Sequence, residues 1–203
     1  MSNGERPELE SETKKKQLFE KIKSGAIVTS KESITLSSQE KSHFYYDIKK
    51  ILGDPESLDL ISELMLEEVR KLKGKSVGGL EIGAIPVATG LVLKAFQNDI
   101  VLKSFTVRKK TKGHGMKNRI EGNLVHPVVI VDDVITTGRS IKEAIDAVRN
   151  RGKSSRGVIA VIDREDKKSN ILKRNRIKYV TLFRHSEFRG FIEDKLKALG
   201  VRC

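Results

Sequence analysis

The chain has 203 residues and carries 40 Lys and Arg against 27 Asp and Glu, which gives it a formal net charge of +13. Its apolar runs suffice for a large core, but even long ones such as Gly157–Ile162 fall far short of the roughly 20 residues of a membrane helix. The N-terminus (Met1–Glu12) lacks the features of a signal peptide, and a single cysteine, Cys203, excludes an internal disulfide. We therefore expect a cytoplasmic protein. Its positive charge is suited to binding nucleic acid, an anionic membrane or a small polyanionic substrate.

The N-terminal third predicts a small α+β unit. Residues 1–13 are expected to form a mobile tail, and Lys14–Ser24 a helix with Leu18, Phe19 and Ile22 on one face. Two short β segments and a clear amphipathic helix follow, at Ile34–Leu36, Phe44–Ile48 and Ser57–Lys73.

Strands and helices alternate through the rest of the chain. Strands are predicted at Val77–Ile82, Ile100–Val107, Pro127–Val131, Gly157–Ile162 and Lys178–Phe183, and helices at Pro86–Phe96, Ser140–Asn150 and Ser186–Leu199. Thr111–Asn118 contains glycines, lysines and a histidine without apolar periodicity, which predicts an exposed, mobile loop. The alternation indicates an α/β fold with a largely parallel sheet. We expect a single domain, with a hood over residues 14–56 and a core over residues 57–203.

The segment Val128–Ser140, VVIVDDVITTGRS, carries the strongest chemical signal. A buried strand brings Asp132 and Asp133 to the carboxyl edge of the sheet, where open α/β sheets bind ligands. A turn with two threonines, a glycine and a serine follows at a helix start, where free N–H groups favour an anion. Acids beside an anion site suit sugar hydroxyls or a divalent metal, so the segment predicts a sugar-phosphate site. The alternative, hydroxyls that only cap the helix beside a surface turn, leaves the acids on an apolar strand unexplained.

This segment resembles the phosphoribosyl pyrophosphate (PRPP) motif of type I phosphoribosyltransferases over its full length. Three further segments resemble those of the orotate phosphoribosyltransferases within that family: Ile34–Asp47 (ITLSSQEKSHFYYD), Phe105–Gly115 (FTVRKKTKGHG) and the pair Asp163-Arg164 after a strand. They stand in the family's order, and the resemblance covers roughly residues 15–195. It implies the type I phosphoribosyltransferase fold, a central, mainly parallel sheet flanked by helices, with a small N-terminal α+β hood.

The resemblance also implies a reaction: transfer of the 5-phosphoribosyl group from PRPP to N1 of orotate, giving orotidine 5′-monophosphate and pyrophosphate in de novo UMP biosynthesis. Mg²⁺ is the implied cofactor, held mainly by the substrate, with Asp132 and Asp133 as candidate ligands. A homodimer with shared active sites is implied, because in the family the Lys/His loop commonly reaches into the partner's site.

The resemblance implies a role for each matching position. The implied catalytic residues are Lys112, His114, Asp132 and Asp133. The implied PRPP-binding residues are Arg108, Lys109, Lys112, His114, Asp132, Asp133, Val134, Ile135, Thr136, Thr137, Gly138, Arg139 and Ser140. The implied orotate-binding residues are Tyr45, Tyr46, Thr136 and Arg164.

Two positions depart from the family's pattern. Many members have Lys where this chain has Ser37, and many bacterial members have Tyr-Lys where it has Ile82-Gly83. Backbone amides of Gly83–Ile85 are candidates to serve the pyrophosphate instead, and Lys41 is a candidate for the missing positive charge.

Two alternative functions remain open. The first is a purine or other phosphoribosyltransferase of the same fold. Arg164 argues against it, because an arginine suits the carboxylate of orotate and a purine base has no carboxylate. The second is a PRPP sensor that binds nucleic acid, for which the charge of +13 is suggestive. The scarcity of aromatic residues among the basic ones argues against single-strand binding. We expect small-molecule substrates and no membrane or nucleic-acid partner, with Lys167–Lys178 as a solvated basic face.

Overall fold

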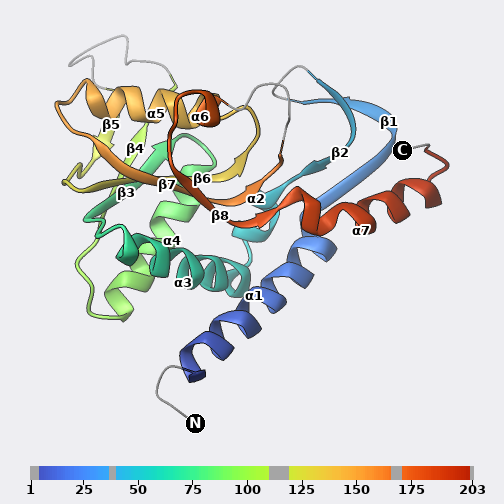
Figure 1. Cartoon of the computed structure of the whole chain (residues 1–203), viewed down its shortest axis with the longest axis horizontal. Helices are drawn as coiled ribbons and strands as arrows, with labels where there is room; N and C mark the ends of the chain where they lie inside the picture. Colours follow the sequence, from blue (N-terminus) through green and yellow to red (C-terminus); the bar gives the residue numbers. More distant parts are fainter. Residues whose placement is uncertain (1–4, 37–39, 110–118, 166–170, 202–203) are drawn as a thin grey trace.

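The computed structural model describes residues 5–36, 40–109, 119–165 and 171–201 (Figure 1). The predictions for the loop Thr111–Asn118, with Lys112 and His114, and for Ser37 lie outside these residues. The helices are α1 (Glu5–Gly25), α2 (Ile48–Leu52), α3 (Pro55–Lys71), α4 (Ala84–Gln97), α5 (Arg139–Arg149), α6 (Ile171–Arg174) and α7 (His185–Ala198). The strands are β1 (Ile27–Thr35), β2 (Lys41–Tyr46), β3 (Ser76–Leu80), β4 (Lys103–Val107), β5 (Ile120–Gly122), β6 (Val128–Ile135), β7 (Ser155–Asp163) and β8 (Tyr179–Arg184).

The central sheet confirms the predicted α/β class. Its described strands run in the order β5-β4-β3-β6-β7-β8, and every neighbouring pair is parallel except β4 with β5. From β3 the chain moves outward to β4 and β5, and it then returns to the other side of β3 with β6. The order of the sheet therefore reverses between β3 and β6, which is where ligands of such sheets bind.

The two faces of the sheet hold separate cores. Along β6, Val129 and Val131 pack with α3 and α4, whereas Val128 and Ile130 pack with α5 and α6. This follows from the alternation of side chains along a strand, and it explains why the first four residues of β6, Val128–Val131, are all apolar. Figure 1 shows the same layering, with α5 on one side of the sheet and α3 and α4 on the other.

A separate two-stranded hairpin, formed by β1 and β2 and called the hood hairpin below, lies beside the sheet. Its strands pair antiparallel, with Ile27 opposite Tyr46. Buried residues Ile27 and Tyr46 join the core that contains Leu18 of α1 and Phe188 of α7. The hood hairpin is thereby fixed against the C-terminal helix as well as the N-terminal one.

Several element bounds predicted from the sequence need correction; β1, for example, runs over Ile27–Thr35 rather than Ile34–Leu36. Helix α1 begins at Glu5 rather than Lys14, so residues 5–13 are helical. This stretch has no apolar face. Polar contacts extend the helix instead, such as Ser11 Oγ to Glu67 of α3 at 3.4 Å, beside good helix-forming residues. Strand β6 does not end at the two acids but continues to Ile135, since this part still pairs with β7. The short elements α2, α6 and β5 had no sequence signal strong enough to predict them.

Among the residues described, no helix combines the length and the hydrophobicity needed to cross a membrane.

Candidate functional site

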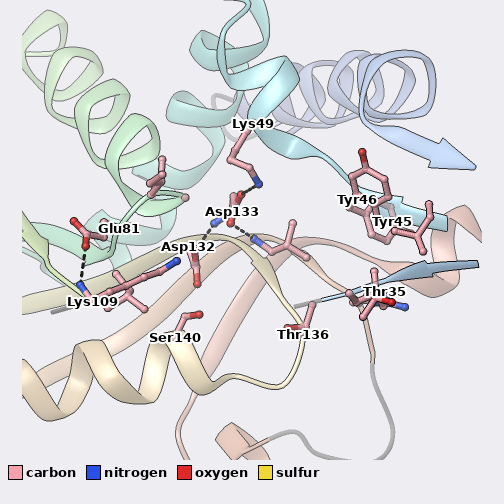
Figure 2. A pocket seen from close by; sticks show the side chains of 17 residues that line it. Thr35, Tyr45, Tyr46, Lys49, Glu81, Lys109, Asp132, Asp133, Thr136 and Ser140 are labelled. Atoms are coloured by element: carbon pink, nitrogen blue, oxygen red, sulfur yellow. Dashed lines mark hydrogen bonds and ion pairs between the residues drawn. The ribbon is translucent and has the colours of Figure 1, made fainter. Parts of the chain in front are cut away.

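A cavity of about 480 Å³ opens where β3 and β6 end side by side (Figure 2). The close approach of the two segments is visible at Gly83, where a Cβ would meet the carboxylate of Asp133. The described residues that line the cavity are Ile34, Thr35, Leu36, Tyr45, Tyr46, Lys49, Leu80, Glu81, Ile82, Gly83, Lys109, Asp132, Asp133, Val134, Thr136, Ser140 and Arg164. They come from the hood hairpin, α2, the start of α5, strands β3 and β6, and the segments that follow β3, β4, β6 and β7.

The two acids of β6 form the floor of the cavity. Asp132 and Asp133 are 7% and 8% exposed. The N–H of Asp133 donates to Asp132 Oδ1 at 3.0 Å, and the N–H of Val134 donates to Asp133 Oδ1 at 2.9 Å. Burial, together with the neighbouring Asp133 carboxylate, raises the pKa of Asp132 well above its ordinary value. The two carboxylates repel each other in a buried place, so a bound cation or hydroxyl groups that donate hydrogen bonds would stabilise them.

Lys49 provides one counter-charge that the sequence did not reveal. Its Nζ lies 3.5 Å from Asp133 Oδ2, and Figure 2 shows the side chain reaching down from α2. No local pattern marks this lysine, because its position depends on how α2 packs above the sheet. Lys41, the sequence-based candidate for a missing charge, is exposed at the start of β2 and is not among the cavity-lining residues described.

The turn between β6 and α5 forms another wall. Thr136 and Ser140 line the cavity at the helix start, and the Arg139 N–H donates to Thr137 Oγ1 at 3.3 Å. Gly138 has φ 76°, and a Cβ on it would stand 2.8 Å from Leu172 Cγ. Only glycine combines that left-handed conformation with the missing Cβ. The first turn of α5 presents backbone N–H groups and the positive end of the helix dipole, which suit a phosphate.

Arg164 and two tyrosines close the side below the hood hairpin. Arg164 follows β7, is 9% exposed, and its N–H donates to Ile135 O at 2.9 Å. Tyr45 and Tyr46 are neighbours on β2, so their side chains leave opposite faces of the strand. The Tyr46 hydroxyl shares a hydrogen bond with His185 Nδ1 at 2.9 Å, and burial raises its pKa. Both tyrosines line the cavity, but the hydroxyl of Tyr46 is already engaged.

The segment after β3 adds an acid and orients a lysine. Glu81 Oε1 accepts a hydrogen bond from the Lys109 N–H at 2.8 Å, so β3 and β4 are joined at their carboxyl ends (Figure 2). The peptide bond between Glu81 and Ile82 is cis. Glu81 was not predicted as a site residue, because the sequence places it inside the predicted strand Val77–Ile82, whereas β3 ends at Leu80, directly before it.

Nine residues with a role implied by resemblance line this cavity: Tyr45, Tyr46, Lys109, Asp132, Asp133, Val134, Thr136, Ser140 and Arg164. Five others do not: Arg108, Ile135, Thr137, Gly138 and Arg139. Of these, Arg108 faces Glu121 with 3.9 Å between their charged groups, and the Ile135 side chain is buried in the core beneath α5. Lys112 and His114 lie outside the described residues.

The formal charges of the described cavity wall cancel. Lys49, Lys109 and Arg164 are opposed by Glu81, Asp132 and Asp133. A wall with separate regions of both signs suits a ligand that carries hydroxyl groups and several anionic groups.

Known proteins with this fold and this arrangement of acids and turn are phosphoribosyltransferases. Residues 47–187 match the family described as phosphoribosyl transferase domain. The chain is 40% identical over 155 residues to the orotate phosphoribosyltransferase of Aquifex aeolicus, which covers 75% of this chain and 84% of that protein. It is 39% identical over 165 residues to the orotate phosphoribosyltransferase of Methanocaldococcus jannaschii, covering 80% of this chain and 90% of that one. The chain belongs to the orotate phosphoribosyltransferase family.

A solved structure is similar over nearly its whole length. The crystal structure of Mycobacterium tuberculosis H37Rv orotate phosphoribosyltransferase in complex with Fe(III) dicitrate matches with a TM-score of 0.71 at 30% identity. The match covers 86% of this chain and 98% of that structure. The type I phosphoribosyltransferase fold expected from the sequence is thus confirmed, with its small antiparallel sheet at the N-terminal end.

Proposed function

We propose that the cavity between β3 and β6 binds PRPP and orotate together, and that different parts of its wall contact each substrate. The chain, as an orotate phosphoribosyltransferase, transfers a phosphoribosyl group to orotate. In the proposed arrangement the turn 134–140 holds the 5′-phosphate and Asp132 and Asp133 hold the ribose hydroxyls. Arg164 pairs with the orotate carboxylate beside Tyr45. The observation that carries this proposal is a buried arginine in the same cavity as the acid pair and the anion-binding turn.

The cancelled charge of the described wall supports two further parts of the proposal. PRPP and orotate are both anionic, so a neutral wall needs additional positive charge when they bind. We assign that charge to Lys112 and His114, as the family resemblance implies, and to Mg²⁺. In this scheme Lys109, just after β4, approaches the pyrophosphate together with the amides of Gly83–Ile85, which follow β3. Arg108 joins them only if its side chain turns away from Glu121 when the substrate binds.

The donor set fits Mg²⁺ that is bound mainly through substrate. Two adjacent carboxylates, Asp132 and Asp133, offer hard oxygen ligands, and the described residues contain no cluster of three or more metal-binding side chains. An octahedral ion would thus take most of its ligands from substrate and water. When bound, it supplies positive charge that stabilises the departing pyrophosphate.

The side chains act by binding and orientation rather than as nucleophiles. Bond breaking at C1 of the ribose leaves positive character on the sugar and places negative charge on the leaving group. Asp132 and Asp133 fix the ribose so that C1 faces N1 of orotate, and their negative charge favours the positive sugar. Lys109 provides fixed positive charge on the leaving-group side. The hood hairpin and Tyr45 shield the base side from water.

The experiment that tests this function follows the loss of orotate absorbance with PRPP and Mg²⁺. The wild-type chain should consume orotate, and Lys112→Ala should slow the reaction strongly. Activity with hypoxanthine or guanine and none with orotate would refute the choice of base. A wild-type rate in Lys112→Ala would refute the role of that lysine.

We also propose a homodimer, which the exposed face of α4 supports. Ile85, Leu93 and Phe96 lie on one side of this helix at spacings of eight and three, and they are 39%, 58% and 77% exposed. Ile82, 67% exposed, precedes the helix and lines the cavity. Several large exposed apolar side chains on one side of a helix favour an interaction surface. Phe96→Asp should shift the protein to a smaller species in analytical ultracentrifugation, whereas an unchanged mass would exclude this surface.

The cytoplasmic location stays a prediction that rests on the low cysteine content.

A further inference from the structure

An aromatic cluster packs against Arg164. The guanidinium carbon of Arg164 lies 5.2 Å from the centre of the Phe44 ring. The same ring stacks on the His185 imidazole, with centroids 5.1 Å apart and an interplanar angle of 9°. Three elements therefore meet here: β2, the end of β7 and the start of α7.

The cluster is fixed by further contacts on both sides. Tyr46 shares a hydrogen bond with His185 Nδ1 at 2.9 Å, and its ring meets the Phe44 ring edge-on at 5.9 Å. The Ser186 N–H donates to Glu165 Oε2 at 2.7 Å, which ties the start of α7 to the residue after Arg164. Phe44 and Tyr46 are two residues apart on β2, so both point to this side of the strand.

Phe44 touches Arg164 without lining the cavity. Among the described residues, the cavity wall includes Tyr45, Tyr46 and Arg164 but not Phe44. Any effect of Phe44 on a ligand in the cavity therefore passes through its neighbours.

The surroundings of His185 favour its neutral form. Burial lowers its pKa, and the positive charges of Arg189 and Arg164 lower it further, while Glu165 and Glu193 act in the opposite direction. A neutral imidazole can stack on Phe44 without placing a second cation beside the Arg164 guanidinium.

We propose that Phe44, supported by His185 and Tyr46, is a positioning residue that holds the Arg164 guanidinium in the plane required by the orotate carboxylate. The proposal rests on the proposed function of Arg164. A planar guanidinium binds a carboxylate through two parallel hydrogen bonds only if its plane is set, and a long arginine side chain is otherwise free to rotate. The aromatic ring restricts the plane before orotate arrives, so less freedom is lost on binding.

The test compares steady-state constants for both substrates. Phe44→Leu removes the aromatic face and should raise the KM for orotate about two- to thirteenfold, the cost of immobilising one long side chain on binding. The KM for PRPP should stay within about twofold, because the acids and the phosphate turn are untouched. Phe44→Tyr keeps the ring and should restore the orotate KM. Equal increases in both KM values would overturn the proposal, since they indicate general damage to the hood hairpin.

Phe191 provides a matched control. It lies on α7 and also meets cations, with Lys23 Nζ 5.2 Å and Lys195 Nζ 4.8 Å from the ring centre. Phe191→Leu removes an aromatic ring with the same type of contact outside the cavity and should leave both KM values unchanged. An orotate KM raised as much by Phe191→Leu as by Phe44→Leu would overturn the proposal.

The Arg164→Ala variant distinguishes a failure of the proposed role of Arg164 from a failure of the positioning role of Phe44. If Arg164→Ala leaves the orotate KM unchanged, the assigned role of Arg164 fails and the positioning role fails with it. If Arg164→Ala raises this KM but Phe44→Leu does not, only the positioning role fails. In the Arg164→Ala background, Phe44→Leu should add no further increase, because the group that it positions is gone. An additive increase would show that Phe44 acts on orotate by another route.

Discussion

Replacing Gly83 with alanine should impair catalysis and spare the fold. Gly83 has φ −57° and ψ −38°, a right-handed conformation that alanine adopts freely, and such replacements usually stabilise by about 0.4–1 kcal/mol. A Cβ at this position would nevertheless overlap the Asp133 carboxylate, with Oδ1 nearest and Cγ 2.7 Å away, so the carboxyl group must retreat by about 1 Å to reach ordinary van der Waals contact. Since a misplacement of about 1 Å can cost on the order of 10²-fold, we expect kcat/KM for PRPP to fall about ten- to hundredfold.

The assay is the loss of orotate absorbance at varied PRPP, beside urea unfolding of the same samples. Gly190→Ala is the control, because Gly190 lies in α7 and no atom stands within 4 Å of the place that the alanine methyl group would take. It should keep wild-type kinetics and gain up to about 1 kcal/mol in unfolding free energy. A Gly83→Ala enzyme with wild-type kcat/KM would refute the reasoning, because the placement of Asp133 would then not matter.

Three further predictions concern single contacts. Lys49→Gln removes the cation 3.5 Å from Asp133, and PRPP kcat/KM should fall about three- to tenfold at low salt; an unchanged value would mean that solvent already screens this pair. Gly138→Ala combines φ 76° with a contact to Leu172, so urea unfolding should show a loss of about 1–3 kcal/mol; a wild-type unfolding curve would contradict this. His185 has a lowered pKa, so below pH 6.5 the unfolded state binds more protons than the folded state, and the stability present above pH 6.5 is lost as pH falls. His185→Gln should lose less stability than wild type from pH 6.5 downward, and identical pH profiles would refute the assignment.

The fold was predictable where a local sequence pattern alone identifies the element. The β-branched run that becomes β6 and the periodic face of α3 identify a buried strand and an amphipathic helix without further information. The ends of these elements were less predictable. Asp132 and Asp133 look like a strand end in the sequence, yet pairing with β7 carries the strand past them. The division into a hood and a core near residue 56 stays a prediction.

The candidate site shows the same division between local and tertiary signals. Asp132 was predictable because an acid at the carboxyl end of a buried parallel strand faces the ligand edge. Glu81 was not, because β3 ends directly before it, at Leu80, rather than beyond it as the sequence predicted. Lys49 was not predictable, since only the way α2 packs above the sheet brings it to Asp133. The orientation of Tyr46 toward His185 likewise depends on α7, which is 139 residues away in sequence.

The most direct test of the central claim compares orotate with uracil, which lacks the carboxylate, as acceptors for the phosphoribosyl group. The account predicts that wild type prefers orotate by about 30-fold or more in kcat/KM, the value of a buried charged hydrogen-bonded pair, and that Arg164→Ala loses most of this preference. If Arg164→Ala kept the wild-type preference, the carboxylate would bind elsewhere, and the division of the cavity proposed above would be wrong.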